Sequence, residues 1–357
     1  MLRHENRVKN RGVNMKTCSI LLFILCVGFS NLFSQPAGGK NVAGFYVLQD
    51  YDYFKTMLAD IRRPAFHMRF YYDDAVRFSS LAVTGKHKFW DVSFGGFFPM
   101  LGYNFKVAPQ PFGVAFFIEA SAHMLLDFDT PSSDVINTDF RIGGGLAGRP
   151  LSQLKQLSLR YKFFHESTHI GDEYTLTAVA DSAFRRYNVS YEAHELFVAF
   201  DHRARRPESL LDFVYLRLYA GGRRLNTGAF EDFKDKSALR SLKIKNKNES
   251  QLGGEFFLRG WLQPELEPDK INELVKRIIR PQYFMAAAEF YRRDQYAVAA
   301  PAKKWSYNVA AGLVYGNYFE SKRTTKLLLN YYRGVNPHGQ LRMYQISYLG
   351  VDFSVDF

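Results

Sequence analysis

The last nine residues of the chain alternate strictly between apolar and small or acidic side chains. Residues 349–357 read LGVDFSVDF, so that every second residue is Leu, Val or Phe and the residues between them are Gly, Asp or Ser. Successive side chains of a β-strand point to opposite faces. The pattern therefore predicts a strand with one apolar face and one polar face.

As a terminal segment that ends on Phe357, this stretch resembles the assembly signal of bacterial outer-membrane β-barrels. A lipid-facing wall and a polar lumen produce the same two-residue repeat. The alternation recurs along the chain, and the expected strands are 65–72, 89–103, 112–126, 135–148, 156–167, 186–201, 209–222, 251–262, 281–294, 305–318, 324–334 and 343–357. We expect an all-β fold, a single transmembrane antiparallel β-barrel of about twelve strands in the bacterial outer membrane, with ten or fourteen strands as the alternatives.

The N-terminal region has the pattern of an export signal. Residues 20–29 form an apolar core of about ten residues, which is too short for a membrane-spanning helix. We predict a leader and signal peptide over 1–34, a periplasmic segment with a short helix near 53–61 over 35–64, and the barrel over 65–357. Residues 266–280 are expected to form an amphipathic helical connector.

Cysteine content and net charge limit the kinds of partner and bound group that the sequence predicts. The cysteines, Cys18 and Cys26, both lie within the predicted signal, so no disulfide or cysteine metal site is expected beyond it. The net charge of +12 would suit nucleic acid, but an exported barrel meets anionic lipid instead. We expect as partners outer-membrane lipids, lipopolysaccharide and, through the C-terminal strand, the barrel-assembly machinery. The basic run LKIKNKNE within an external loop at 223–250 is either solvated or contacts lipopolysaccharide phosphates.

Strand parity predicts which charged side chains line the lumen. Arg141, Arg160 and Lys162 alternate with apolar neighbours, so they should face inward. The resulting interpretation is a binding, transport or structural barrel with a basic lumen. If that lumen is open, it should prefer anions.

The stretch FFHESTHIGDEY, residues 163–174, admits several interpretations. His165-Glu166-x-x-His169 matches a zinc-protease motif, but that motif needs a helix, where the two histidines share one face. On an extended strand the two histidines stand about 13 Å apart, which is too far for one metal ion. We therefore expect no zinc site.

A second interpretation makes the strand an outer-wall hydrolase. His165 and Ser167 share the lipid-facing side, so His165 could act as general base for a Ser167 nucleophile. The arrangement resembles the His-x-Ser pair of outer-membrane phospholipase A, a twelve-stranded barrel in which an asparagine orients the histidine. That resemblance implies the orienting role for Asn188, and Asp172 and Glu173 could hold a calcium cofactor. The chain departs from that family directly after the serine, where Thr168 and His169 replace Asn-Gly.

Two further interpretations involve no catalysis. His165, His169, Asp172 and Glu173 could form a polar network that holds loop 168–185 over the barrel. Alternatively, the basic side chains of the lumen could form a ligand or ion site in the barrel mouth.

Five segments carry a resemblance to a known family, spread over roughly residues 45–357. They are LADIRRPAF (58–66), SSDVINTDFRIG (132–143), LSLRYKFFHESTHIGDEY (157–174), RYNVSYE (186–192) and LLLNYYRGVNPHGQ (327–340). The chain resembles a group of Gram-negative outer-membrane proteins that is known as a domain of unknown function. This resemblance implies a barrel and an outer-membrane location, and it implies no established activity.

Overall fold

The structure is a computed structural model. It describes residues 44–48, 53–74, 86–106, 112–130, 133–150, 154, 156–171, 187–205, 213–232, 240–241, 247–259, 281–293, 305–316, 318–319, 324–342 and 345–356. Residues from Ala43 to Phe357 form one compact unit. No helix in the described ranges is long and apolar enough to cross a membrane.

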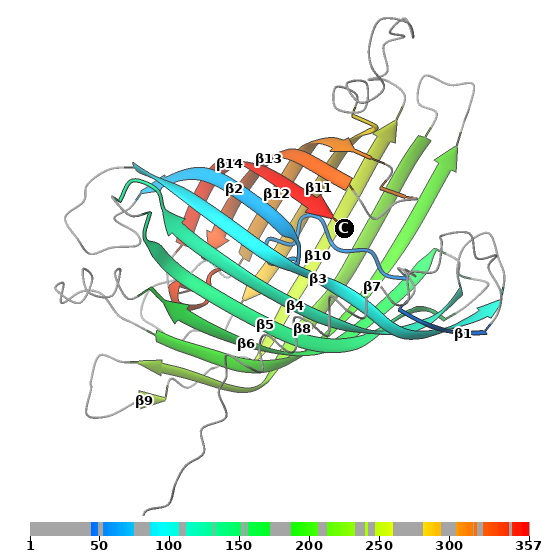
Figure 1. Ribbon diagram of the computed structural model, residues 1–357, viewed down its shortest axis with the longest axis horizontal. Helices are drawn as coiled ribbons and strands as arrows, with labels where there is room; N and C mark the ends of the chain where they lie inside the picture. The colour runs from blue at the N-terminus through cyan, green and yellow to red at the C-terminus, as the bar shows by residue number, and fades with distance from the viewer. Residues whose placement is uncertain are drawn as a thin grey trace, which may run out of the picture. The chain divides into compact units, whose positions relative to one another are not determined.

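Twelve antiparallel strands close into a barrel (Figure 1). They are β2 (Phe66–Asp74), β3 (Lys86–Lys106), β4 (Phe112–Asp127), β5 (Val135–Arg149), β6 (Leu157–Ile170), β7 (Tyr187–Arg205), β8 (Phe213–Asp232), β10 (Asn248–Arg259), β11 (Tyr283–Arg293), β12 (Trp305–Tyr315), β13 (Thr324–Val335) and β14 (Gln345–Asp356). Neighbours in sequence pair with one another, and β14 pairs with β2 to complete the ring. The predicted fold is thereby confirmed.

Three short elements supplement the barrel. β1 (Gly44–Val47) pairs with residues 101–104 of β3, and β9 (Arg240–Ser241) pairs with the end of β8. The 3-10 turn η3 (Gly339–Leu341) lies in the connection between β13 and β14. None of the three is one of the twelve ring strands, and η3 contacts residues of β5 and β6.

The alternation of side chains produces an apolar outer wall. On β6, Tyr161 and Phe163 are about 40 % exposed, whereas Arg160 and Lys162 between and beside them are buried. On β14, Leu349, Val351 and Phe353 are exposed in the same way. The exposed set consists of Leu, Val, Ile, Met, Phe, Tyr and Trp on nearly every strand, as a lipid-facing band requires.

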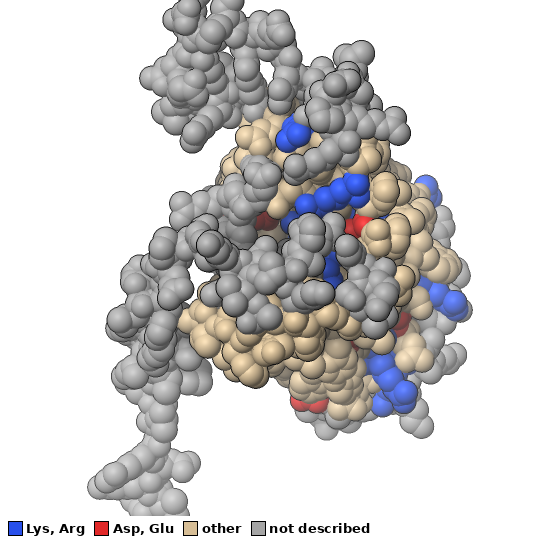
Figure 2. All heavy atoms as spheres, turned by 90° about the vertical axis from the view of Figure 1, so that its right-hand side faces the viewer, with Lys and Arg blue, Asp and Glu red and all other residues tan. Residues whose placement is uncertain are grey.

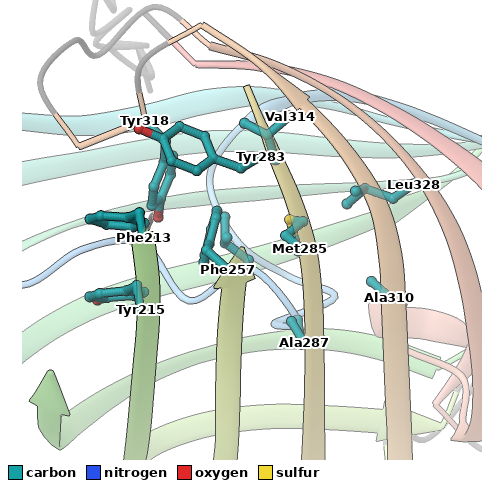
Figure 3. Close-up of a cluster of buried hydrophobic side chains, with 12 residues drawn as sticks. Phe213, Tyr215, Phe257, Tyr283, Met285, Ala287, Ala310, Val314, Tyr318 and Leu328 are labelled. Carbon is teal, nitrogen blue, oxygen red and sulfur yellow. The ribbon is translucent and has the colours of Figure 1, made fainter. Parts of the chain in front are cut away.

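One half of the interior is packed with apolar side chains. A cluster from β8, β10, β11, β12 and β13 fills the end of the barrel at which β14 ends, and Tyr318 from the β12–β13 connection caps it (Figure 3). The rings of Tyr318 and Phe257 stack at 4.8 Å between centroids. Figure 2 views the molecule from the right-hand side of Figure 1, where blue and red side chains lie together within a mostly tan surface.

Several sequence-based expectations need correction. Residues 53–61 form turns and no helix, and the described part of 35–64 belongs to the same compact unit as the barrel. The expected loop 223–250 is partly strand, because β8 continues to Asp232 and β10 begins at Asn248. The predicted signal at 1–34, its two cysteines and the predicted helix at 266–280 lie outside the described residues.

Candidate functional site

Residues 53–65, here called the lumen segment, run through the inside of the barrel. Their backbone groups form hydrogen bonds with inward-facing side chains from strands around the ring. Glu255 accepts from the Leu58 N–H at 2.7 Å, and Asn308 donates to the Ala59 carbonyl at 2.7 Å. Arg217 donates to the Thr56 carbonyl at 3.3 Å, and Ser93 donates to the Ala65 carbonyl at 2.9 Å. These partners belong to β10, β12, β8 and β3. The segment is therefore enclosed by the barrel wall.

The aromatic ring of Phe54 shows how closely this segment fits. The guanidinium groups of Arg160 and Arg217 each lie 4.7 Å from its centroid. Cations favour such positions over an aromatic face, particularly when water is excluded. The segment thus satisfies charged groups of the wall as well as filling space.

Toward the other end of the lumen, beside a second buried apolar cluster, charged side chains form a buried network. The Glu166 carboxylate receives Arg141 at 2.6 Å and Arg342 at 2.5 Å, with Arg62 at 3.5 Å. Arg62 also pairs with Asp139 at 2.5 Å. All five side chains are at most 3 % exposed. We call these five residues the Glu166 cluster, and it joins β5, β6, the lumen segment and the β13–β14 connection.

His338 extends this cluster toward β3. Its two ring nitrogens lie 3.6 Å from Asp139 and 3.7 Å from Asp91. Burial alone would lower the pKa of His338, but the two carboxylates outweigh it and raise the pKa above the usual 6.5. The backbone N–H of Gly339 donates to Asp139, and a Cβ at Gly339 would collide with the side chain of Thr168. The β13–β14 connection is therefore held inside the barrel by close backbone approach.

Four of the five segments that carry the family resemblance meet at this place. The lumen segment contributes Arg62, INTDFRIG contributes Asp139 and Arg141, FFHEST contributes Glu166, and NPHGQ contributes His338. The Arg342 guanidinium donates a hydrogen bond at 2.8 Å to the hydroxyl of Tyr191, which belongs to the remaining segment, RYNVSYE. The buried ionic centre therefore unites sequence stretches that lie far apart along the chain.

The three predicted lumen cations point inward, and each is paired. Arg141 contacts Glu166, Arg160 contacts Glu195 at 3.0 Å, and Lys162 contacts Glu119 at 2.6 Å. Among the described residues, twelve Lys or Arg and twelve Asp or Glu side chains are buried. The expectation of a basic lumen is therefore wrong, because positive and negative side chains are balanced there. The carboxylate that neutralises each of the three cations comes from a different strand.

Little room remains between these side chains. A cavity lined by Asp60, Arg223, Glu289 and Asn308, among others, has a volume of about 10 Å³ when measured with a water-sized sphere. Such a volume accommodates about one water molecule. Around this cavity, buried side chains of the wall and of the lumen segment occupy the lumen.

His165 and Ser167 lie on the outer wall. Both have the parity of the exposed Tyr161 and Phe163, and both are half-buried. The motif continues as strand to Ile170, so His165 and His169 stand four residues apart on an extended chain. This geometry is unsuited to a shared zinc ion.

The register of β6 and β7 selects a different neighbour for His165 from the one that the sequence suggested. His165 pairs directly with Glu192, and Ser167 pairs with Ser190. Asn188 lies on β7 beyond the last paired position of β6 and pairs with Glu231 of β8. Glu192, which is also half-buried and outward-facing, was missed because residue order does not reveal register.

The remaining predicted site residues do not form a described group with His165 and Ser167. His169 is exposed on the outer wall, with its ring 6.0 Å from that of Phe140. Asp172 and Glu173, predicted to bind calcium or to join a loop network, lie outside the described residues. The structure brings His165 and Ser167 to one face, and it places Arg141, Arg160 and Lys162 on the opposite face.

The sequence analysis missed the acidic half of the ionic core. Glu166 and Asp139 have the same parity as the predicted lumen cations, so alternation could have placed them inside. Arg62, His338 and Arg342 lie in segments without alternation. No periodic signal could have placed these three in the lumen.

A family model described as "Protein of unknown function (DUF1207)" matches residues 36–225, which is more than half of the chain. The chain belongs to the DUF1207 family. The match covers β1 to β7 and most of β8, including the lumen segment, Asp139 and Glu166. No curated protein matches this DUF1207 chain.

Several solved structures are similar at low identity. The outer-membrane phospholipase dimer of Salmonella typhi with bound calcium is 10 % identical, with 87 % of this chain and 95 % of that chain covered and a TM-score of 0.42. The translocator domain of the autotransporter NalP from Neisseria meningitidis is 11 % identical, with 96 % of each chain covered and a TM-score of 0.37. The NanC porin is 10 % identical, with 82 % and 100 % covered and a TM-score of 0.37.

Proposed function

We propose that this DUF1207 chain is an integral barrel of the Gram-negative outer membrane, exported by the signal in residues 1–34, and that it serves as a binding or structural barrel without a diffusion pore. The observation that carries this proposal is the lumen segment, which contacts wall side chains on several sides of the ring. An ion-conducting barrel needs a continuous aqueous path. Two apolar clusters, one toward each end of the lumen, and buried ion pairs such as Arg141–Glu166 occupy the space between the wall strands.

The apolar outer wall supports the membrane location. Leu327, Leu329 and Tyr331 are exposed on β13, and the residues between them are buried. Exposed apolar patches of this extent are rare on soluble monomers and typical of surfaces that meet lipid. As further partners we propose the outer-membrane lipids, lipopolysaccharide and the assembly machinery, which would bind the terminal strand ending on Phe357.

Planar-bilayer recording tests the closed lumen. The purified barrel should first show heat-modifiable mobility on gels, which establishes that it is folded. We then expect no steady conductance at moderate voltage, whereas an open basic lumen would conduct anions preferentially. A stable ohmic conductance from heat-modifiable protein would refute the proposal.

A second candidate function is phospholipid hydrolysis on the outer wall. The observation that favours it is the cross-strand pairing of His165 with Glu192, two residues from the outward-facing Ser167. In this proposal Ser167 Oγ attacks an ester carbonyl, its proton passes to His165, and the lysolipid alcohol leaves with that proton. Glu192 would orient His165, and water would then hydrolyse the acyl-serine ester.

The hydrolase candidate has a matched control on the neighbouring strand. Ser190 lies opposite Ser167, has the same outward parity and is also half-buried. We expect wild type and Ser190→Ala to release fatty acid from phospholipid in detergent micelles, with calcium or with chelator, and Ser167→Ala to abolish this release, because it removes the nucleophile. No release by the wild type in either condition removes this candidate and leaves the closed barrel untouched.

A further inference from the structure

The outward-facing cations that the structure describes on the strands lie at one end of the barrel. Among the strand side chains that the structure describes, four Lys or Arg residues point away from the lumen: Lys88, Arg224, Arg292 and Arg333. Lys88 lies near the start of β3, Arg224 of β8 lies opposite the first residue of β10, and Arg292 and Arg333 lie near the ends of β11 and β13. Because neighbouring strands are antiparallel, all four are at the end opposite to that where β14 ends.

Two of these cations belong to a continuous patch over β11–β14, which we call the rim patch. Arg292 pairs across strands with Trp305, and Arg333 pairs with Tyr307 on one side and Ser347 on the other. The Arg292 guanidinium lies 5.9 Å from the Trp305 ring, and the rings of Tyr307 and Tyr331 are 6.0 Å apart. The patch thus combines guanidinium, hydroxyl and indole groups on one outward surface.

The surroundings of the rim patch favour an anion. No outward-facing residue described on β11, β12, β13 or β14 is Asp or Glu. The side chain of Tyr331 interacts with those of Ser347, Tyr307 and Arg333, so the hydroxyls are gathered around the guanidinium. Guanidinium groups bind phosphate through two parallel hydrogen bonds, and hydroxyls add further donors.

The position of the rim patch along the barrel axis indicates that the anion belongs to a lipid headgroup. Arg333 is two residues beyond Tyr331 and four beyond Leu329, which is in the exposed apolar band. A side chain at this boundary meets the headgroup layer, where Trp and Tyr also concentrate. Arg292 and Arg333 stand two strands apart with β12 between them, so their backbones are roughly 10–12 Å apart.

We infer that the rim patch is a binding site for a phosphorylated glycolipid of the membrane leaflet that meets this end of the barrel, with Arg292 and Arg333 each contacting one phosphate. This inference rests on the proposed outer-membrane location. A lipid that carries two phosphates on a sugar headgroup matches two guanidiniums at this separation. A glycerophospholipid, which carries one phosphate, matches only half of the site.

Native mass spectrometry of the purified, heat-modifiable barrel tests this assignment. The probes are bisphosphorylated lipid A, its dephosphorylated form and phosphatidylglycerol, each added to detergent-solubilised protein. Bisphosphorylated lipid A should bind best, and the double variant Arg292→Gln/Arg333→Gln should weaken it by about tenfold or more. Equal binding of the dephosphorylated form or of phosphatidylglycerol would overturn the assignment.

Arg224→Gln is the matched control. Arg224 is exposed at the same end, but it lies on β8 between His194 and Asn248 and outside the rim patch. We expect this variant to bind lipid A nearly as well as the wild type does. An equal loss in Arg224→Gln would show a general effect of charge and no site. All variants change exposed side chains, so gel mobility should remain that of the folded barrel, and bilayer recordings report separately on the closed lumen.

Discussion

A guanidinium nitrogen of Arg342 lies 2.5 Å from a carboxylate oxygen of Glu166, although the two residues are 176 positions apart in sequence. The contact ties the β13–β14 connection to the inner face of β6. The same guanidinium nitrogen is 2.8 Å from the hydroxyl of Tyr191 on β7. The connection therefore belongs to the core of the barrel mouth.

Neutralising Glu166 should destabilise the barrel. Glu166→Gln leaves three guanidinium groups without their shared carboxylate, and breaking a buried ion pair costs about 3–5 kcal/mol. We expect the folded band on unboiled gels to disappear at a lower temperature. Ser167→Ala, at the next position and on the opposite face, should leave that temperature nearly unchanged. Equal melting of the two variants would contradict the role of Glu166.

His338 should make the β13–β14 connection sensitive to pH. Its pKa is raised in the folded protein, so the stabilisation is complete below the unfolded value near 6.5 and is lost as the pH rises through the folded value. Proteolysis of residues 336–342 should therefore be faster at about pH 8.5 than at about pH 5.5. His338→Gln should reduce this difference, whereas His169→Gln, exposed on the outer wall, should preserve it.

Cysteine labelling can locate the lumen segment directly. In a background without Cys18 and Cys26, a cysteine at Leu58, which is 1 % exposed, should resist a maleimide reagent in the folded barrel. A cysteine at Phe45, which is 89 % exposed, should react readily. Both should react after boiling. Rapid labelling at position 58 in folded protein would show that the segment leaves the lumen.

A charged side chain introduced into the exposed apolar band of the outer wall should lower the free energy of unfolding of the barrel. Leu329 is outward-facing, and its cross-strand partners are Ala311 and Val351. Leu329→Lys should destabilise the barrel in lipid by about 2–4 kcal/mol, because a cation near the bilayer midplane loses its hydration. Asn248→Lys, exposed at the start of β10, should cost much less. Similar unfolding midpoints for both variants in lipid vesicles would place the band outside a membrane.

Alternation was sufficient to predict the wall. LGVDFSVDF and LSLRYKFF each assign their side chains to a face without any knowledge of their neighbours, because the period of a strand is a local property. All twelve predicted strands form, with ends that shift by a few residues except at β8, which continues ten residues further than expected.

Register and the lumen segment could not be predicted in the same way. The pairing of His165 with Glu192 instead of Asn188 depends on how far β6 and β7 slide past one another, and no single strand encodes that offset. The lumen segment, which contains LADIRRPA, has no periodicity. Its position depends on carboxylates and amides contributed by β5, β10, β12 and β14.

The seam between β2 and β14 has six paired positions, whereas β13 and β14 share twelve. β2 begins at Phe66, immediately after the lumen segment ends. β2 is therefore preceded directly by the lumen segment. These residues must already lie inside the barrel when β2 pairs with β14. We expect closure of this short seam to be the last step of assembly. A sheet that closed before the segment entered would enclose unpaired charges, so the filling of the lumen sets the order in which the barrel can be built.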